Sequence, residues 1–167
     1  MSGSVSPIDK VVALAKKYNA LTFLDEVHAV ALYGPTGAGY AERMGMQDEI
    51  DLITGTLGKG FGVFGGYCAG NEAMIDALRS NAAGFIFTTS LPPAICAAAQ
   101  SSIAHVRQSQ VERDNHQKQT RTLLRSLLEA NLPVLHSQSH IIPLFIGDPA
   151  LTKTVSDILL NEYKIYV

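Results

Sequence analysis

The sequence predicts an α/β domain, in which helices cover both faces of a mostly parallel sheet. Short apolar runs of strand length alternate with longer segments of helical periodicity along the 167 residues. Hydrophobic residues make up 47% of the chain and charged residues 17%, which is typical of a globular protein and argues against disorder. A polar stretch over residues 131–139 breaks the pattern. We therefore predict a large domain over residues 1–131 and the start of a smaller α+β subdomain over residues 132–167.

The first half of the chain begins with a helix, followed by three strands. Ser6 is a suitable N-cap, Pro7 fits the first helical turn, and apolar residues at helical spacing carry the helix to about Asn19. The apolar run LTFL over residues 21–24 predicts a buried strand that ends at Asp25. Two further strands are expected over residues 51–54 and 67–69.

The second half of the chain is richer in predicted helix. A helix is expected from Ala73 to about Ser80, and Pro92-Pro93 begin a long helical region, continuous or broken once, that reaches Ala130. Asp148-Pro149 begin a last helix that ends near Glu162. Three apolar runs predict strands, and the proline in the second of them indicates a sheet edge or a bulge. These runs cover residues 85–88, 141–146 and 165–167.

Composition and charge exclude several classes of function. A formal net charge of −2 gives no electrostatic basis for binding nucleic acid or an anionic membrane. No apolar run approaches the roughly 20 residues of a membrane-spanning helix. Cys68 and Cys96 lie far apart, without the spacing of metal ligands or of a disulfide framework. We therefore predict no metal site and expect a reducing compartment.

A lysine, Lys59, lies in the glycine-rich segment TGTLGKGFG over residues 54–62. A P-loop would need glycine in place of Ile53 and serine or threonine in place of Gly60, so that interpretation fails. A dinucleotide-binding motif over residues 60–65 would need to open a helix, yet a predicted strand follows. Two interpretations remain: a lysine that forms a Schiff base with a cofactor, where glycines let the backbone approach a flat ring, and an ordinary surface lysine in a loop. In the first, Thr56 would place a hydroxyl on the cofactor's phosphate.

Asp25 favours the cofactor interpretation, because it ends an apolar strand and so belongs at the carboxyl edge of the sheet, where α/β proteins bind ligands. Pyridoxal phosphate acts as an electron sink only while its ring nitrogen is protonated, and a carboxylate beside that nitrogen keeps the proton in place. His28 is suited to bond the ring hydroxyl. The alternatives are a turn-capping role for Asp25 and a structural role for His28.

Three hydroxyl residues, Thr88, Thr89 and Ser90, follow a predicted strand and precede the helix that begins at Pro92-Pro93. Hydroxyls and free backbone N–H groups at the start of a helix are typical of a phosphate site. Ordinary N-capping by serine or threonine explains the same pattern.

Three segments together resemble the α-oxoamine synthases, a family of fold-type-I pyridoxal-phosphate enzymes. They are LDEVHAV over residues 24–30, TGTLGK over residues 54–59 and FIFTTSLPP over residues 85–93. The similarity runs from Ser2 to Val167 without an obvious gap. It implies that the α/β domain is the large domain of a pyridoxal-phosphate-dependent transferase.

The resemblance also implies roles for individual residues. Lys59 would hold the cofactor as a Schiff base and later move a proton on the substrate's α-carbon. Asp25 would pair with the pyridinium nitrogen, and His28 would meet the ring hydroxyl. The phosphate would be bound by Thr56 from the same subunit and by Thr88 and Thr89 from the neighbouring subunit of a homodimer.

Two further segments, LYGPTGAG over residues 32–39 and SHIIP over residues 139–143, are most similar to the family member that condenses glycine with succinyl-CoA. The implied products are 5-aminolevulinate, CO₂ and CoA, in the first step of haem synthesis. The alternatives are a sister synthase that uses another amino acid or acyl-CoA, and a truncated, non-catalytic homologue that only dimerises.

Departures from the family pattern lead to three expectations. The family's glycine after the DEVHAV segment is Ala31 here, which would tighten the backbone. The chain ends on the predicted strand at Val167 and lacks the family's upstream ring-stacking residue and its downstream arginine for the substrate carboxylate. We therefore expect a fragment, at both ends, that has little activity alone.

The compartment follows only from resemblance. Bacterial members of the family are cytoplasmic and eukaryotic members work in the mitochondrial matrix. Two segments, DPAL over residues 148–151 and ILLN over residues 158–161, are similar to fungal members. The expected location is therefore the mitochondrial matrix, with the cytoplasm as the alternative for a bacterial source.

Overall fold

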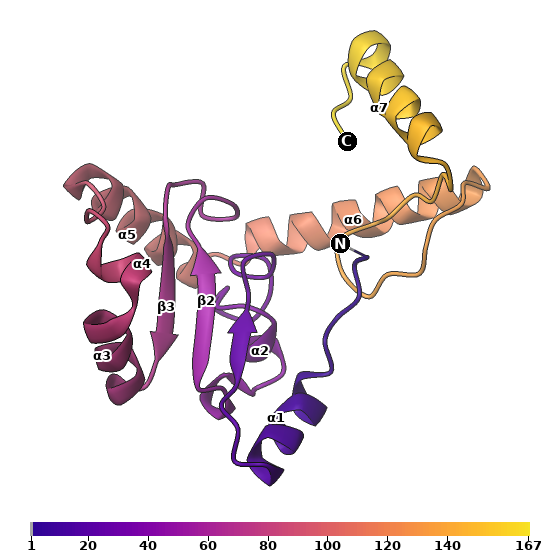
Figure 1. The fold of residues 1–167 in the computed structure, drawn as a ribbon. Coiled ribbons are helices and arrows are strands. Elements are labelled where there is room, and N and C mark those ends of the chain that lie inside the picture. Colours follow the sequence, from indigo (N-terminus) through magenta and orange to yellow (C-terminus); the bar gives the residue numbers. More distant parts are fainter. Residues whose placement is uncertain (1) are drawn as a thin grey trace. The chain divides into compact units, whose positions relative to one another are not determined.

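The computed structural model of the chain describes residues 2–167. Helices and strands alternate through the first half of the chain, and helices dominate the second half (Figure 1). The elements are α1 (Ile8–Lys17), β1 (Phe23–Asp25), α2 (Tyr40–Arg43), the 3₁₀ helix η1 (Gln47–Glu49), β2 (Leu52–Thr56), β3 (Gly66–Gly70), α3 (Glu72–Asn81), α4 (Ala83–Ile86), α5 (Pro93–Gln108), α6 (Val111–Glu129) and α7 (Pro149–Tyr163).

The chain forms two compact units. One unit covers Ser6–His116 and contains the sheet. The other covers Gln117–Val167 together with the N-terminal residues up to Val5. The predicted division between residues 131 and 132 stays a prediction.

The sheet has the strand order β1-β2-β3 (Figure 1). β1 and β2 are parallel, with Asp25 opposite Thr54, whereas β2 and β3 are antiparallel, with Thr54 opposite Cys68. The predicted α/β class is confirmed, but the described sheet is mixed rather than mostly parallel. The cause is the connection over residues 57–65, which is too short for the crossover that a parallel neighbour needs.

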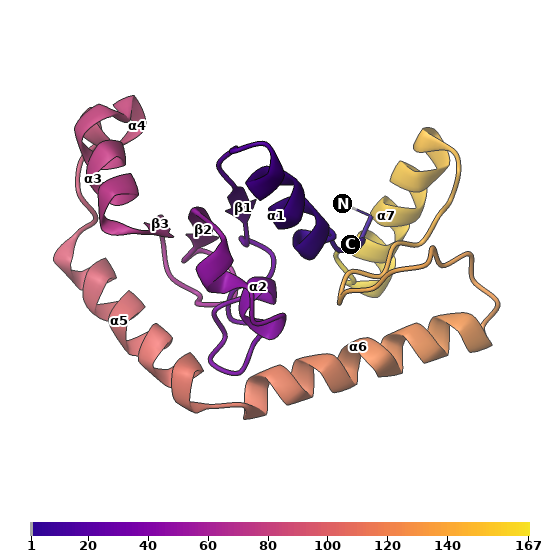
Figure 2. The ribbon, with the colours of Figure 1, turned by 90° about the horizontal axis from the view of Figure 1, so that it is seen from below.

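The two faces of the sheet have different neighbours. Leu24 and Ile53 lie on one face, where they pack with buried residues of α1 and α2 such as Ile8 and Ala41. Asp25, Thr54 and Cys68 lie in register on the other face, because directly opposed residues share a face. α3 packs against β3, and it continues into α4 beyond that edge of the sheet (Figures 1 and 2). Ile75 and Leu78 of α3 line a cavity together with Thr54 and Cys68, so helices flank both faces, as predicted.

A second core cluster lies beside the sheet and beneath the glycine-rich loop. Its buried members are Val30, Ala31, Leu57 and Phe61, together with Ala99 of α5. Ile103 and Val106, one and two turns further along α5, pack against the same cluster. This cluster positions the loop that carries Lys59.

Predicted helices agree with the structure better than predicted strands do. The long helical region is broken once, between α5 and α6, and α7 begins as expected, with the Asp148 carboxylate accepting the Leu151 N–H at 2.7 Å. Residues 85–88 are not a strand: α4 ends at Ile86, and the Ile86 N–H donates to the Ala82 carbonyl at 3.0 Å. A short apolar run fits a helix turn as well as a strand, and among residues 2–167 no strand pairs with this run.

The predicted strands over residues 141–146 and 165–167 are also wrong. The first is reduced to an isolated bridge between Val134 and Leu144. Pro143 has no N–H to extend a ladder, although its carbonyl accepts the Leu135 N–H at 2.9 Å. The last residues follow Lys164, whose left-handed conformation ends α7. Within residues 2–167, no helix is long and apolar enough to cross a membrane.

Candidate active site

The structure brings the side chains of Lys59 and His28 together. The Lys59 amine, Nζ, lies 3.1 Å from Nε2 of His28, and both side chains are exposed to solvent. Lys59 comes from the loop after β2, and His28 comes from the series of turns after β1. The parallel pairing of β1 and β2 explains the meeting, because the carboxyl ends of parallel strands lie at the same edge of a sheet.

The loop around Lys59 projects the lysine outward. Leu57 and Phe61, two residues to either side, are buried in the second core cluster, while Lys59 is exposed. Backbone hydrogen bonds close the loop, from the Gly62 N–H to the Lys59 carbonyl at 2.9 Å and from the Val63 N–H to the Leu57 carbonyl at 2.8 Å. Gly62 has a φ of +66°, which favours glycine. An amine is thus presented to solvent from an anchored base.

Asp25 lies at the end of β1 and is exposed. Its Oδ1 accepts the Val27 N–H at 2.9 Å, so the carboxylate does hold the turn that follows, as the alternative interpretation expected. Among residues 2–167, no hydrogen bond to Oδ2 is found, and that oxygen can accept from a ligand. Asp25 is opposite Thr54 in the sheet, so its side chain shares a face with those of Thr54 and Thr56.

The Thr56 hydroxyl supports the loop of Lys59 from within. Its Oγ1 accepts the Gly58 N–H at 3.1 Å and donates to the Gly65 carbonyl at 3.3 Å. The second bond is long, and a phosphate oxygen would be a stronger, charged acceptor for the same proton. Thr56 therefore has a structural role that leaves phosphate binding open to it.

Thr88 and Thr89 are exposed residues that follow α4. Within the described residues, no side-chain hydrogen bond joins either of them to Lys59, His28 or Asp25. The structure thus gathers Lys59 with His28 and places Asp25 and Thr56 on one sheet face, but within the described residues it joins neither threonine to them by a hydrogen bond. Their contact with the phosphate of a neighbouring subunit stays a prediction.

Glu26, next to Asp25, is a buried residue that the sequence analysis did not select. Only 3% of it is exposed, and its two carboxylate oxygens accept the N–H groups of Tyr40 at 3.1 Å and Ala41 at 2.7 Å. Gly39 passes so close that a methyl group there would lie within 2.8 Å of the carboxylate carbon. Glu26 thereby fixes the segment between β1 and α2, which carries His28.

Burial raises the pKa of Glu26 above its ordinary value of 4.5. The folded protein then holds this proton more tightly than the unfolded chain does, so ionisation of Glu26 costs stability as the pH rises above 4.5. We expect Glu26→Gln, which keeps the shape but cannot ionise, to gain stability relative to the wild type with increasing pH above that value. Urea unfolding at a series of pH values checks this, and a difference that stays constant with pH would contradict it.

Arg113 of α6 is a second buried residue that the sequence analysis missed. It is 4% exposed, and its guanidinium donates to the carbonyls of Val106 at 2.7 Å and Pro35 at 2.8 Å and to the Gln110 side chain. No carboxylate pairs with it in the described part of the chain. It ties the loop over residues 33–37 to the junction of α5 and α6. One arginine among the three of α6, a helix of mostly polar residues, gives no sequence signal for burial.

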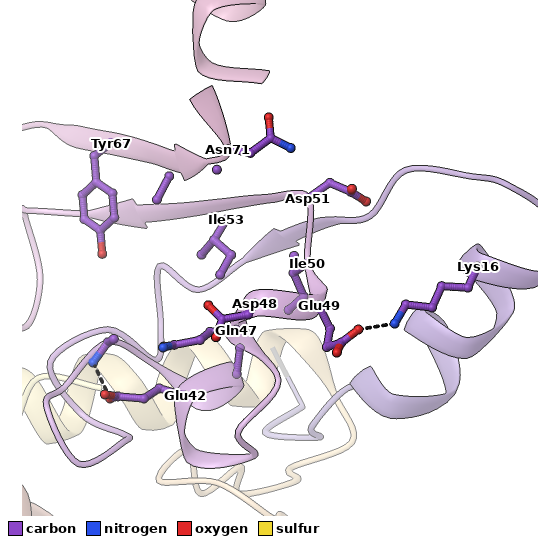
Figure 3. Close-up of a pocket in the computed structure, with 14 residues that line it drawn as sticks. Lys16, Glu42, Gln47, Asp48, Glu49, Ile50, Asp51, Ile53, Tyr67 and Asn71 are labelled. Carbon is purple, nitrogen blue, oxygen red and sulfur yellow. Dashed lines mark hydrogen bonds and ion pairs between the residues drawn. The ribbon is translucent and has the colours of Figure 1, made fainter. Parts of the chain in front are cut away.

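A cavity of about 690 Å³ lies on the face of the sheet opposite to Asp25 and Thr54 (Figure 3). It is lined by Ile53 and Tyr67, and the Tyr67 hydroxyl points into it (Figure 3). Burial, and the nearby charge of Glu26, raise the pKa of Tyr67. Because Ile53 and Thr54 point to opposite faces of the sheet, this cavity is separate from the site of Lys59. Residues 2–167 also contain no group of side chains suited to hold a metal ion.

Known proteins resemble this chain over its whole length. Residues 1–167 match the family model described as aminotransferase class I and II. The chain is 54% identical to 5-aminolevulinate synthase from Rickettsia bellii and 53% identical to that from Bradyrhizobium diazoefficiens. Both matches cover the whole of this chain, but only 40% of the first relative and 41% of the second. It is 49% identical to mitochondrial 5-aminolevulinate synthase from Schizosaccharomyces pombe, over 30% of that relative. The chain thus spans less than half the length of these relatives.

Solved structures show the same fold. A serine palmitoyltransferase from Sphingomonas wittichii matches with a TM-score of 0.92 and 31% identity, over all of this chain and 42% of that one. The S. paucimobilis serine palmitoyltransferase, solved with a bound PLP–myriocin aldimine, matches with a TM-score of 0.91 and 28% identity, over all of this chain and 44% of that one. The α/β fold of this chain is therefore the same as that of a protein whose solved structure contains pyridoxal phosphate.

Proposed function

Since this chain belongs to the aminotransferase class I and II family, we propose that it is the cofactor-binding part of an acyltransferase that joins glycine to succinyl-CoA. The products would be 5-aminolevulinate, CO₂ and CoA. The observation that carries the proposal is the Lys59 amine, presented 3.1 Å from His28 at the edge of the sheet where Asp25 ends its strand. The relatives named 5-aminolevulinate synthase, at 49–54% identity, support this choice of reaction over those of sister synthases.

The donor set fits pyridoxal phosphate. It comprises the exposed primary amine of Lys59, a carboxylate oxygen of Asp25 without a hydrogen bond from the described residues, the imidazole of His28, and the Thr56 hydroxyl, which donates only one long hydrogen bond. When bound, this cofactor stabilises negative charge on the α-carbon of an amino acid. Lys59 would hold it covalently. Asp25 would keep its ring nitrogen protonated, and His28 would donate to its ring hydroxyl.

The same residues would serve the chemistry of glycine. The Lys59 amine, which would hold the cofactor, would also be the base that takes a proton from the substrate's α-carbon. His28, within hydrogen-bond distance of Nζ, would orient that amine. Thr56 would hold the phosphate from one subunit, with Thr88 and Thr89 reaching it from the partner in a homodimer. A non-catalytic homologue would need neither an exposed Lys59 nor the His28 contact.

A trapping experiment tests the assignment. The protein is mixed with pyridoxal phosphate, reduced with borohydride and digested, and its seven lysines are compared by mass spectrometry. We expect the adduct on Lys59 alone. Adducts spread evenly over the lysines would overturn the assignment. Incubating the full-length protein with glycine and a series of acyl-CoA thioesters then tests the proposed preference for succinyl-CoA.

The location follows the same proposal. The mitochondrial name of the S. pombe relative supports the matrix, while the names of the bacterial relatives give no compartment. The cytoplasm is the alternative if the source is bacterial.

A further inference from the structure

We propose that Ala31 is a positioning residue for Lys59, which acts by pressing its methyl group against the peptide that follows the lysine. The inference rests on the proposed function of Lys59 and adds a residue that determines where its amine stands. It follows from the conformation of Ala31, from its contact with Gly60 and from its place in the turn that carries His28.

Ala31 has a backbone conformation that alanine rarely adopts. Its φ is +66°, in the left-handed region that favours glycine. The residue is only 8% exposed, and its N–H donates to the Gly37 carbonyl at 2.8 Å. Arg113 holds the same loop through the carbonyl of Pro35. The surrounding structure thus imposes the conformation and directs the methyl group.

The methyl group of Ala31 lies directly against Gly60. A methyl group at residue 60 would lie 2.6 Å from Cβ of Ala31 and 3.0 Å from the Val30 carbonyl oxygen. The first distance is shorter than any ordinary contact between two methyl groups. Residue 60 must therefore be glycine as long as residue 31 carries a side chain. The backbone directly after Lys59 is held by this contact.

The turn that carries Ala31 also carries His28. The N–H groups of Ala29 and Val30 donate to the Glu26 carbonyl at 2.7 and 2.9 Å, so this segment is internally bonded. It therefore touches Lys59 at both ends, through His28 at the amine and through Ala31 at the following peptide. If one rigid segment sets both contacts, removing the methyl group of Ala31 frees the loop and weakens the contact between Nζ and His28.

Reciprocal substitution tests the contact. Gly60→Ala in the wild-type background is expected to destabilise the protein, because two methyl groups would overlap. The same change combined with Ala31→Gly is expected to be tolerated, because only the 3.0 Å approach to the Val30 carbonyl remains. An equal loss of stability in the two backgrounds, measured by urea unfolding of the full-length protein, would overturn the contact.

The positioning role is tested by measuring the reactivity of the Lys59 amine in the absence of cofactor. Acetylation rates of individual lysines are measured by mass spectrometry, with Lys10 as the internal reference. In the wild type, His28→Ala is expected to change the Lys59 rate roughly 2- to 10-fold, the worth of one hydrogen bond. In Ala31→Gly, the same substitution is expected to change it by much less.

An undiminished effect of His28→Ala in a folded Ala31→Gly protein would overturn the positioning role. That result would leave the proposed function standing, because borohydride trapping at Lys59 tests it independently. Conversely, a missing trapped adduct with a normal His28 effect would count against the function and not against the contact geometry.

Discussion

Replacing Lys59 with alanine is expected to abolish the covalent retention of pyridoxal phosphate and to lower turnover of the full-length protein by at least about 100-fold. The physical reason is that the proposed site has one amine at its centre, 3.1 Å from His28. The visible absorption of the bound cofactor, followed through gel filtration, measures retention. A matched assay with glycine and succinyl-CoA measures turnover.

Lys10→Ala is the control for this substitution, since Lys10 is an exposed lysine on α1. It is expected to keep both the absorption and the turnover. Retention of the absorption by Lys59→Ala, together with its loss on substitution of a different lysine, would show that another amine holds the cofactor.

Replacing Arg113 with methionine is expected to lower the free energy of unfolding by about 2–5 kcal/mol. Methionine keeps the apolar stem, but it removes the charged donor from the part-buried carbonyls of Pro35 and Val106, and a hydrogen bond from a charged group contributes about 1.5–3 kcal/mol. Urea unfolding of the two proteins side by side measures the difference.

Arg125→Met is the matched control in the same helix. Arg125 lies on the exposed side of α6 and approaches Glu129 at 3.8 Å, a pair worth at most about 0.5 kcal/mol. Similar losses for Arg113→Met and Arg125→Met would mean that the hydrogen bonds of the Arg113 guanidinium contribute little.

The arrangement of the candidate site could be anticipated because it follows from local patterns. An apolar run that ends in Asp25 and a glycine-rich loop that follows a strand both indicate the carboxyl edge of a sheet. The pairing of β1 with β2 then brings His28 to Lys59. Each of these two patterns lies within a short stretch of sequence, and the pairing of β1 with β2 joins the two stretches across the 34 positions between Asp25 and Lys59.

The features that sequence did not predict depend on contacts between distant residues. Arg113 is buried because its guanidinium meets the carbonyl of Pro35, 78 positions earlier in the chain. Glu26 is buried because it accepts two N–H groups from α2, an element too short to leave a periodic pattern. Within residues 2–167, the apolar residues 85–88 belong to no sheet and residues 141–146 keep only the bridge from Leu144 to Val134, so tertiary context, and not composition, decides their conformation.

The alternation of buried and exposed residues around Lys59 has a consequence for protein engineering. Leu57 and Phe61 belong to the second core cluster, and they also hold the loop that carries the reactive lysine. A library of variants that repacks this cluster to raise thermal stability would also change the position of the Lys59 amine. Selection for thermal stability and selection for turnover would therefore conflict at these two positions. A design that seeks both would keep Leu57 and Phe61 fixed and vary α1 instead.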